Sequence, residues 1–254
     1  ADPLLTSLFA LIEPIIIQKR GSTLDDLGYD SSHVIDCANH ASILCQSLAY
    51  SASVFGMTMP PAYENTNDPG GLLFLHAHEP SVVLGVAALG AQLGSQPATF
   101  IAARHLAYLR PSLYTRQLIP TIAGLKAWLF ASVKLIAPQF PIAAELEGPV
   151  REALEALDRG LAGHSRDHLA RVVAKLVQSG ASLDLKKWIA GVDFTADRAG
   201  FVLCHDLEIS LELIKASEEG STAASNQERN KELVLFSVSE PYFALRKKLG
   251  VAID

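Results

Sequence analysis

The stretch Phe100-Ile-Ala-Ala-Arg-His-Leu-Ala-Tyr-Leu-Arg110 decides how this chain is interpreted. Its apolar residues recur at helical spacing, and a proline is tolerated at the start of a helix, so we predict a helix over residues 97–109. A second stretch, Asp193-Phe-Thr-Ala-Asp-Arg198, carries two carboxylates four positions apart. Side chains at that spacing lie on one face of a helix. Together the two stretches are the strongest candidate site in the sequence.

The first stretch has the layout of a zinc-binding helix but lacks the metal ligands. In an H-E-x-x-H helix, two histidines four positions apart bind one zinc ion, and the glutamate polarises the metal-bound water. Here Arg104, His105 and Tyr108 stand at those three positions. An arginine cannot ligate a metal, a histidine is no substitute for the carboxylate base, and a neutral tyrosine is a poor zinc ligand. We therefore predict no catalytic residue, no bound metal and no cofactor.

The order of the segments resembles that of the gluzincin metallopeptidases of the HtpX type. In that family a sheet precedes the H-E-x-x-H helix, and a later E-x-x-x-D helix supplies the third zinc ligand and an aspartate that orients the site. The resemblance covers roughly residues 34–215 and implies that Asp193 stands for the ligand glutamate and Asp197 for the orienting aspartate. The chain also resembles domains that follow tetratricopeptide repeats in large bacterial proteins, which implies a module of a longer polypeptide.

Loss of the zinc ion would leave carboxylates without a counter-charge, and buried negative charge is costly unless it is paired. The planar guanidinium group suits a pair of carboxylates. We therefore expect the side chain of Arg104 to lie against Asp193, Asp197 or both. A simpler alternative is that Asp193 caps the N-terminus of its helix.

The composition narrows the class of protein. The chain has 254 residues, of which 49% are hydrophobic and 19% charged, and its net charge is -6. This charge, without a basic stripe, argues against a nucleic-acid partner. Three cysteines without paired spacing suggest reduced thiols and a cytoplasmic protein. The start of the chain lacks the basic region of a signal peptide, and the apolar stretch 122–137 contains two lysines, so we expect no membrane insertion.

The predicted fold class is α+β, mostly helical, with a small sheet of two or three strands that we expect to be antiparallel. The domain prediction is one peptidase-like domain over residues 1–254, with an N-terminal extension at 1–33 and a helical C-terminal extension at 216–254. A loop at 216–226 is expected to be mobile. Strands are expected at 15–18, 62–66, 72–76 and 81–85, and helices at 4–13, 34–55, 97–109, 113–137 (kinked or split at Pro120), 149–159, 166–179, 183–190, 195–216, 227–237 and 241–249.

The predicted function is non-catalytic: a pseudopeptidase domain that binds a protein partner or mediates self-association within a larger bacterial protein. In the related peptidases, the sheet edge beside the active-site helix takes up an extended peptide by strand addition. Here residues 71–76 or 81–85 would form that edge, with candidate residues Gly71, Leu72, Phe74, His76 and Val83.

Two alternatives remain open at this stage. The first is a metal-dependent hydrolase with a non-standard ligand set, in which Asp193 and Asp197 combine with histidines such as His76, His78, His105 or His205. The second is a purely structural domain whose apolar surface is covered by neighbouring repeats.

Overall fold

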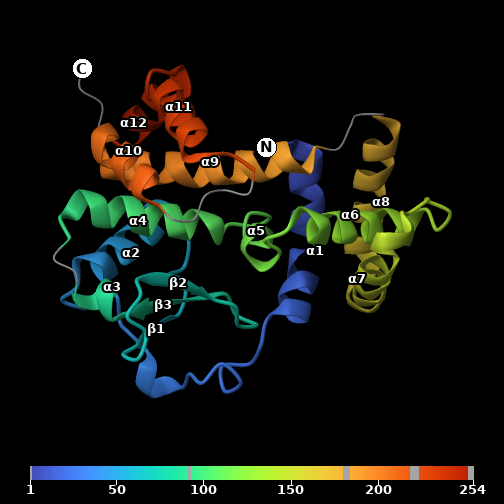
Figure 1. Ribbon diagram of the computed structural model, residues 1–254, viewed down its shortest axis with the longest axis horizontal. Helices are drawn as coiled ribbons and strands as arrows, with labels where there is room; N and C mark the ends of the chain where they lie inside the picture. Colours follow the sequence, from blue (N-terminus) through green and yellow to red (C-terminus); the bar gives the residue numbers. More distant parts are fainter. Residues whose placement is uncertain (1, 91–92, 180–183, 218–222, 251–254) are drawn as a thin grey trace.

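The computed structural model describes residues 2–90, 93–179, 184–217 and 223–250, and it has the predicted class: a mostly helical α+β fold with one small sheet. Two long helices, α4 and α9, lie side by side and connect the parts of the molecule (Figure 1). The sheet and α2 lie on one side of α4, and α10, α11 and α12 pack around α9. Among the described helices, none has both the length and the apolar character that a bilayer crossing requires.

Helix α1 (Pro3–Arg20) forms the centre of the largest hydrophobic core. Asp2 caps its first turn, and its buried side chains recur at helical spacing as far as Ile16. The strand predicted at 15–18 is therefore wrong, because the apolar stripe of the helix continues through Pro14. Within residues 1–33, which were expected to be an extension, the helix buries one face completely: Leu5, Leu8, Phe9 and Ile12 have no exposed surface.

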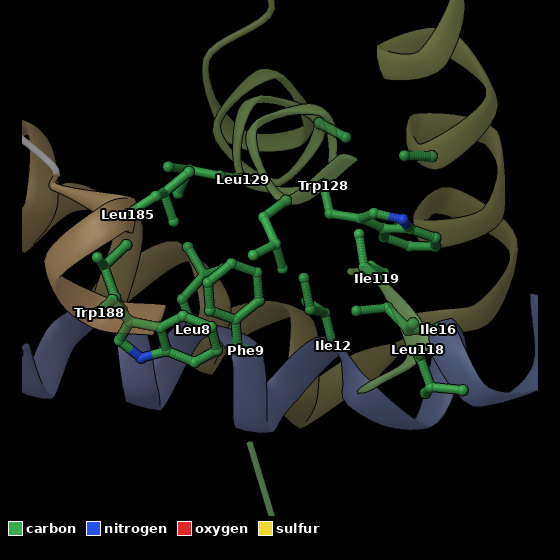
Figure 2. Close-up of a cluster of buried hydrophobic side chains, with 14 of the residues drawn as sticks. Leu8, Phe9, Ile12, Ile16, Leu118, Ile119, Trp128, Leu129, Leu185 and Trp188 are labelled. Carbon is green, nitrogen blue, oxygen red and sulfur yellow. The ribbon is translucent and has the colours of Figure 1, made fainter. Parts of the chain in front are cut away.

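Residues of α4 and α9 also contribute to this core, together with four further helices: α5 (Thr115–Leu118), α6 (Ile122–Ile136), α7 (Glu147–Gly160) and α8 (Gly163–Gln178). The expected break at Pro120 is present, between α5 and α6. Figure 2 shows α1 with side chains of α6 and α9 gathered over it, including Trp128 and Trp188. The rings of Phe9 and Trp188 lie 4.5 Å apart between centroids. A short 3-10 turn (Ala144–Leu146) precedes α7.

A buried glutamate ties α1 to the segment before α5. The carboxylate of Glu13 accepts hydrogen bonds from the backbone N–H of Ser112 (3.0 Å) and of Thr115 (2.8 Å), and from the Thr115 hydroxyl (2.9 Å). Burial raises the pKa of Glu13, and these three hydrogen bonds act in the opposite direction. The contact explains how a carboxylate is tolerated on the buried face of α1.

The sheet has three strands in the order β1-β3-β2, formed by β1 (Ala62–Asn65), β2 (Leu72–Leu75) and β3 (Ser81–Gly85). Strand β3 is antiparallel to β2 but parallel to β1, so the expected antiparallel sheet is mixed. The reason lies in burial, because all five residues of β3 are buried, and the central place in a sheet suits such a strand. β2 is consequently an edge strand and β3 is not.

Helix α2 (Ile43–Val54) is shorter than the predicted helix 34–55. Residues 31–33 form a 3-10 turn, and Val34 pairs with Tyr63 beside the sheet. Turns around Asp36 and His40, held by their side chains, keep residues 36–42 out of the helix. The predicted stop at Gly56 is present, with a φ of 62° that a glycine adopts without strain. A short helix, α3 (Val86–Gly90), follows β3.

The closest helix pair is α4 (Ser95–Tyr108) and α9 (Leu185–Cys204). α9 runs unbroken through residues 191–194, where two separate helices were predicted, and ends at His205, which has a φ of 60°. α10 (Leu207–Ala216) follows, then α11 (Asn226–Ser237) and α12 (Glu240–Lys248). Residues 218–222 of the loop that was expected to be mobile lie outside the described residues.

Gly200 sets the distance between α4 and α9. A Cβ atom at this position would lie 2.8 Å from the Phe100 ring and 2.9 Å from the Phe100 carbonyl oxygen, closer than packed atoms approach. We expect Gly200→Ala to lower the free energy of unfolding by about 1–3 kcal/mol, because the backbone of α4 must shift. Urea denaturation checks the value.

The matched control is Gly148→Ala in α7, where a Cβ atom would meet nothing within 4 Å. This variant is expected to be neutral or up to about 1 kcal/mol more stable, because alanine restricts the unfolded chain. Equal effects of the two substitutions would contradict a close-packing role for Gly200.

Candidate functional site

The candidate site is centred on Asp197, a buried residue of α9 that is paired with two arginines. Arg229 of α11 forms a bidentate salt bridge with Asp197, donating from Nε to Oδ2 (2.8 Å) and from Nη2 to Oδ1 (2.7 Å). Arg104 of α4 donates from Nε to Oδ1 at 2.8 Å. The side chains of Asp197 and Arg229 are only 2% and 1% exposed, whereas that of Arg104 is 23% exposed. The carboxylate therefore joins three helices through contacts that are largely hidden from water.

Asp193 lies one turn earlier on α9 and accepts a hydrogen bond from the Tyr108 hydroxyl at 2.9 Å. The Nε atom of Arg116, from α5, lies 3.9 Å from the same carboxylate oxygen. Asp193 is an interior residue of α9, whose N-terminal cap is Asp184. The alternative that Asp193 caps its helix is therefore wrong, because the helix begins two turns earlier.

The structure brings four of the five predicted site residues into one network: Arg104, Tyr108, Asp193 and Asp197. The expected contact between Arg104 and a carboxylate is present, with Asp197. Burial raises the pKa of the Tyr108 hydroxyl, against the influence of Arg104, so this group stays protonated and donates its hydrogen bond. The carboxylate pair is thus balanced by guanidinium groups and one hydroxyl.

His105 does not join this network, because it faces the sheet. Its ring stacks on that of Phe74 in β2, with 3.6 Å between the ring centroids. Burial, together with the charge of Arg104, lowers the pKa of His105 to about 3, although a hydrogen bond with the Leu73 backbone opposes this shift. His105 is therefore a neutral side chain that fastens α4 to β2.

Arg229 and Arg116 were missed by the sequence analysis. Arg229 lies in a polar helix, among other charged and amide residues, so no pattern distinguishes it from an exposed arginine. The sequence did offer one indication of a second cation. Two buried aspartates require two positive charges, and Arg104 supplies only one of them. That count predicts that a second cation exists but does not say where in the chain it is.

A cavity of about 370 Å³ adjoins the network, between the β2 edge, α4 and α10. Arg104 and Arg229 line it together with Tyr108 and Gln117, and no aspartate or glutamate does so among the described residues. His105 and Ser217 also line it, and its other lining residues are apolar: Leu72, Leu73, Phe74, Phe100, Ile101, Leu213, Ile214 and Ala216. Among the described residues, the charged side chains that line the cavity are therefore both arginines, and most of the other lining residues are apolar.

The peptide-edge residues have different positions. Leu72 and Phe74 lie on the edge strand β2 and line the cavity, and Gly71 directly precedes that strand. Val83 is on the central strand, so the prediction that it forms an edge is wrong. His76 follows β2, and its Nδ1 atom lies 2.9 Å from the Tyr114 hydroxyl.

Of the histidines named for a metal-dependent alternative, His76 and His105 both lie against the ring of Phe74. His76 contacts Tyr114, His105 stacks on Phe74, and His205 ends α9. Within the part of the chain that the structure describes, no three histidine, cysteine, aspartate or glutamate side chains are grouped so that they could hold a metal ion.

No protein-family model matches the sequence, and comparisons with curated proteins and with solved structures give no match either. The resemblance to gluzincin metallopeptidases therefore rests on the motifs and their order alone.

The two arginines of Asp197 are expected to differ in their importance for stability. Arg229→Met leaves a buried carboxylate with one partly exposed partner and should lower the free energy of unfolding by about 3–5 kcal/mol. Arg104→Met should lower it by only about 1–2 kcal/mol, because Arg229 still binds both oxygens of Asp197. Urea denaturation of both variants, with circular dichroism as the readout, measures the difference. A larger loss for Arg104→Met would contradict this assignment.

Proposed function

We propose that this chain is a non-catalytic, peptidase-like domain of a larger bacterial protein, located in the cytoplasm, which binds an extended segment of a partner protein along β2. The observation that carries this proposal is the position of β2, an edge strand that borders a cavity beside α4. An open strand edge next to a cavity offers backbone hydrogen bonds for affinity and a side-chain pocket for specificity.

The hydrogen-bond pattern of the sheet supports an open edge at β2. Gly85 donates its N–H to the Gly71 carbonyl, and directly bonded pairs alternate along an antiparallel ladder. Leu73 and Leu75 therefore face β3, and the backbone groups of Leu72 and Phe74 point away from it. No protein partner for the backbone groups of Leu72 and Phe74 is present among the described residues.

The proposed loss of catalysis is supported by the state of the polar groups. Arg104 and Tyr108 occupy two positions of the zinc-binding pattern, and both are engaged with carboxylates. Tyr108 is held protonated by burial, and His105 is neutral and stacked on Phe74. The resemblance to peptidases that bind extended substrates at the equivalent edge supports a retained binding role.

The first test uses a displayed library of random unstructured peptides, from which binders of the wild-type chain are selected. Leu72→Pro should weaken binding of the selected peptides about tenfold or more. The proline removes an outward-facing N–H and places its ring on the open edge of the sheet. Proline at this position leaves the hydrogen bonds between β2 and β3 intact, since the Leu72 N–H does not point toward β3. Fluorescence anisotropy with labelled peptides measures the dissociation constants.

The matched control is Leu72→Ala, which shortens the same side chain but keeps the backbone N–H. It should bind the peptides several-fold more tightly than Leu72→Pro. The proposal fails if no peptide is enriched, or if the proline variant binds as tightly as the alanine variant.

Self-association is a second candidate, favoured by exposed apolar side chains on the last two helices. Val238 is 72% exposed, Phe243 57% and Leu235 55%, and they lie on or between α11 and α12. An apolar patch of this kind is typical of an interaction surface.

If this patch mediates self-association, the isolated chain should be larger than a monomer by light scattering, and Val238→Ser with Phe243→Ser should return it to a monomer. The same pair of substitutions at the exposed Val86 and Tyr50 is the control, since these residues belong to other elements. A monomeric wild-type chain over the accessible concentration range would exclude this candidate.

A further inference from the structure

We infer that the cavity beside β2 binds an acidic side chain, aspartate or glutamate, in the middle of the bound peptide segment, and that Arg104 is the residue that recognises it. This inference rests on the proposed function, because it needs a peptide on the β2 edge. It goes further by naming the chemistry that the peptide must carry.

The first observation is the incomplete use of the Arg104 guanidinium group. Its Nε atom donates to Asp197, while no described residue accepts a hydrogen bond from Nη1 or Nη2. The side chain is 23% exposed and lines the cavity. Its Cζ atom lies 5.7 Å from the centre of the Tyr108 ring, a cation–π contact that helps to hold the group in place. Two terminal amino groups are thus held at the cavity and are suited to a planar carboxylate.

The second observation is the balance of charge around the cavity. Three guanidinium groups, from Arg104, Arg116 and Arg229, lie against the carboxylates of Asp193 and Asp197. Both oxygens of Asp197 are already bound by Arg229. Asp197 therefore does not depend on Arg104 alone, and Arg104 is the most exposed of the three arginines, so its charge can pair with one carboxylate from a ligand.

The third observation concerns size and position. The cavity has a volume of about 370 Å³, which suits one or two side chains but not a folded element. It opens along Leu72, Leu73 and Phe74, the middle of the β2 edge, so a paired peptide would continue past Arg104 in both directions. Side chains of a strand alternate between its two faces, so one of them would enter the cavity. These features favour an internal acidic residue over a chain terminus.

Selection from the same peptide library tests this inference with four proteins: the wild type, Arg104→Met, Arg104→Lys and the control Arg171→Gln. Arg171 is an exposed arginine on α8, remote from the sheet. We expect wild type and control to enrich aspartate or glutamate at one position. Arg104→Met should lose this preference. Arg104→Lys should keep part of it, because lysine retains the positive charge but lacks the paired N–H donors of the guanidinium group.

One selected peptide is then synthesised with glutamate, with glutamine and with lysine at the enriched position, with both ends blocked. Replacing glutamate by glutamine should weaken binding to the wild type by about 10- to 100-fold, and it should change binding to Arg104→Met by less than about threefold. Affinity for the glutamate peptide should fall as salt is added, more steeply than for the glutamine peptide. A further variant, Ile101→Glu, leaves Arg104 in place and puts a carboxylate on the cavity wall; it should favour the lysine peptide.

The outcomes distinguish a failure of this inference from a failure of the proposed function. Peptides that need the Leu72 edge but show no acidic position, or an acidic preference unchanged in Arg104→Met, would overturn this inference and leave the proposed function standing. If no peptide is enriched by the wild type, the proposed function fails, and this inference fails with it. Circular dichroism and thermal unfolding of each variant confirm that the compared proteins are folded.

Discussion

The buried charge of Asp197 is the constraint on which the arrangement of the helices around the site depends. A carboxylate inside a protein must be paired, and a single partner at its edge would leave one oxygen without compensation. Arg229 meets this requirement from α11, and Arg104 contributes from α4. Because Asp197 lies on α9, the pairing fixes α4 and α11 on α9 through one side chain. Gly200, one turn later, permits the close approach of α4 that the Arg104 contact requires.

The same network determines which chemistry is accessible. A general base needs a group that can take up a proton near neutral pH, and a nucleophile needs an activating base. Here the carboxylates are engaged by guanidinium groups and a hydroxyl, Tyr108 keeps its proton, and His105 is a neutral stacked ring. In these protonation states none of these groups is a free general base, and the arginine beside the cavity is suited to binding a carboxylate.

Much of the fold was predictable from local patterns. Helical periodicity predicted the helices corresponding to α4, α6, α7, α8, α11 and α12 within a few residues, and Pro120 predicted the break before α6. The errors arose where tertiary packing overrides local signals. Residues 15–17 are three β-branched isoleucines, yet they lie in α1, where Ile16 completes the buried stripe of the helix. Two helices were expected on either side of residues 191–194, but α9 passes through them because Ile189, Val192 and Ala196 continue one buried face of the helix.

The site was predictable only in part, for a related reason. The i and i+4 spacing within each stretch placed Arg104 with Tyr108 and Asp193 with Asp197, since such relations are local to a helix. The pairing between stretches followed from charge, because an unpaired buried carboxylate is too costly to be tolerated. The order of the strands and the position of Arg229 are long-range properties, and no local spacing encodes them.

The presence of Arg229 changes the meaning of Arg104. If Arg104 alone balanced Asp197, it would be a structural group with no capacity for a ligand. Because Arg229 binds both oxygens and is fully buried, the structural requirement is largely met before Arg104 contributes. Arg104 is left with one bond to Asp197, partial exposure and a place on the cavity wall beside β2. A cation in that position is more than the fold needs, and a carboxylate on a strand paired with β2 would complete its coordination.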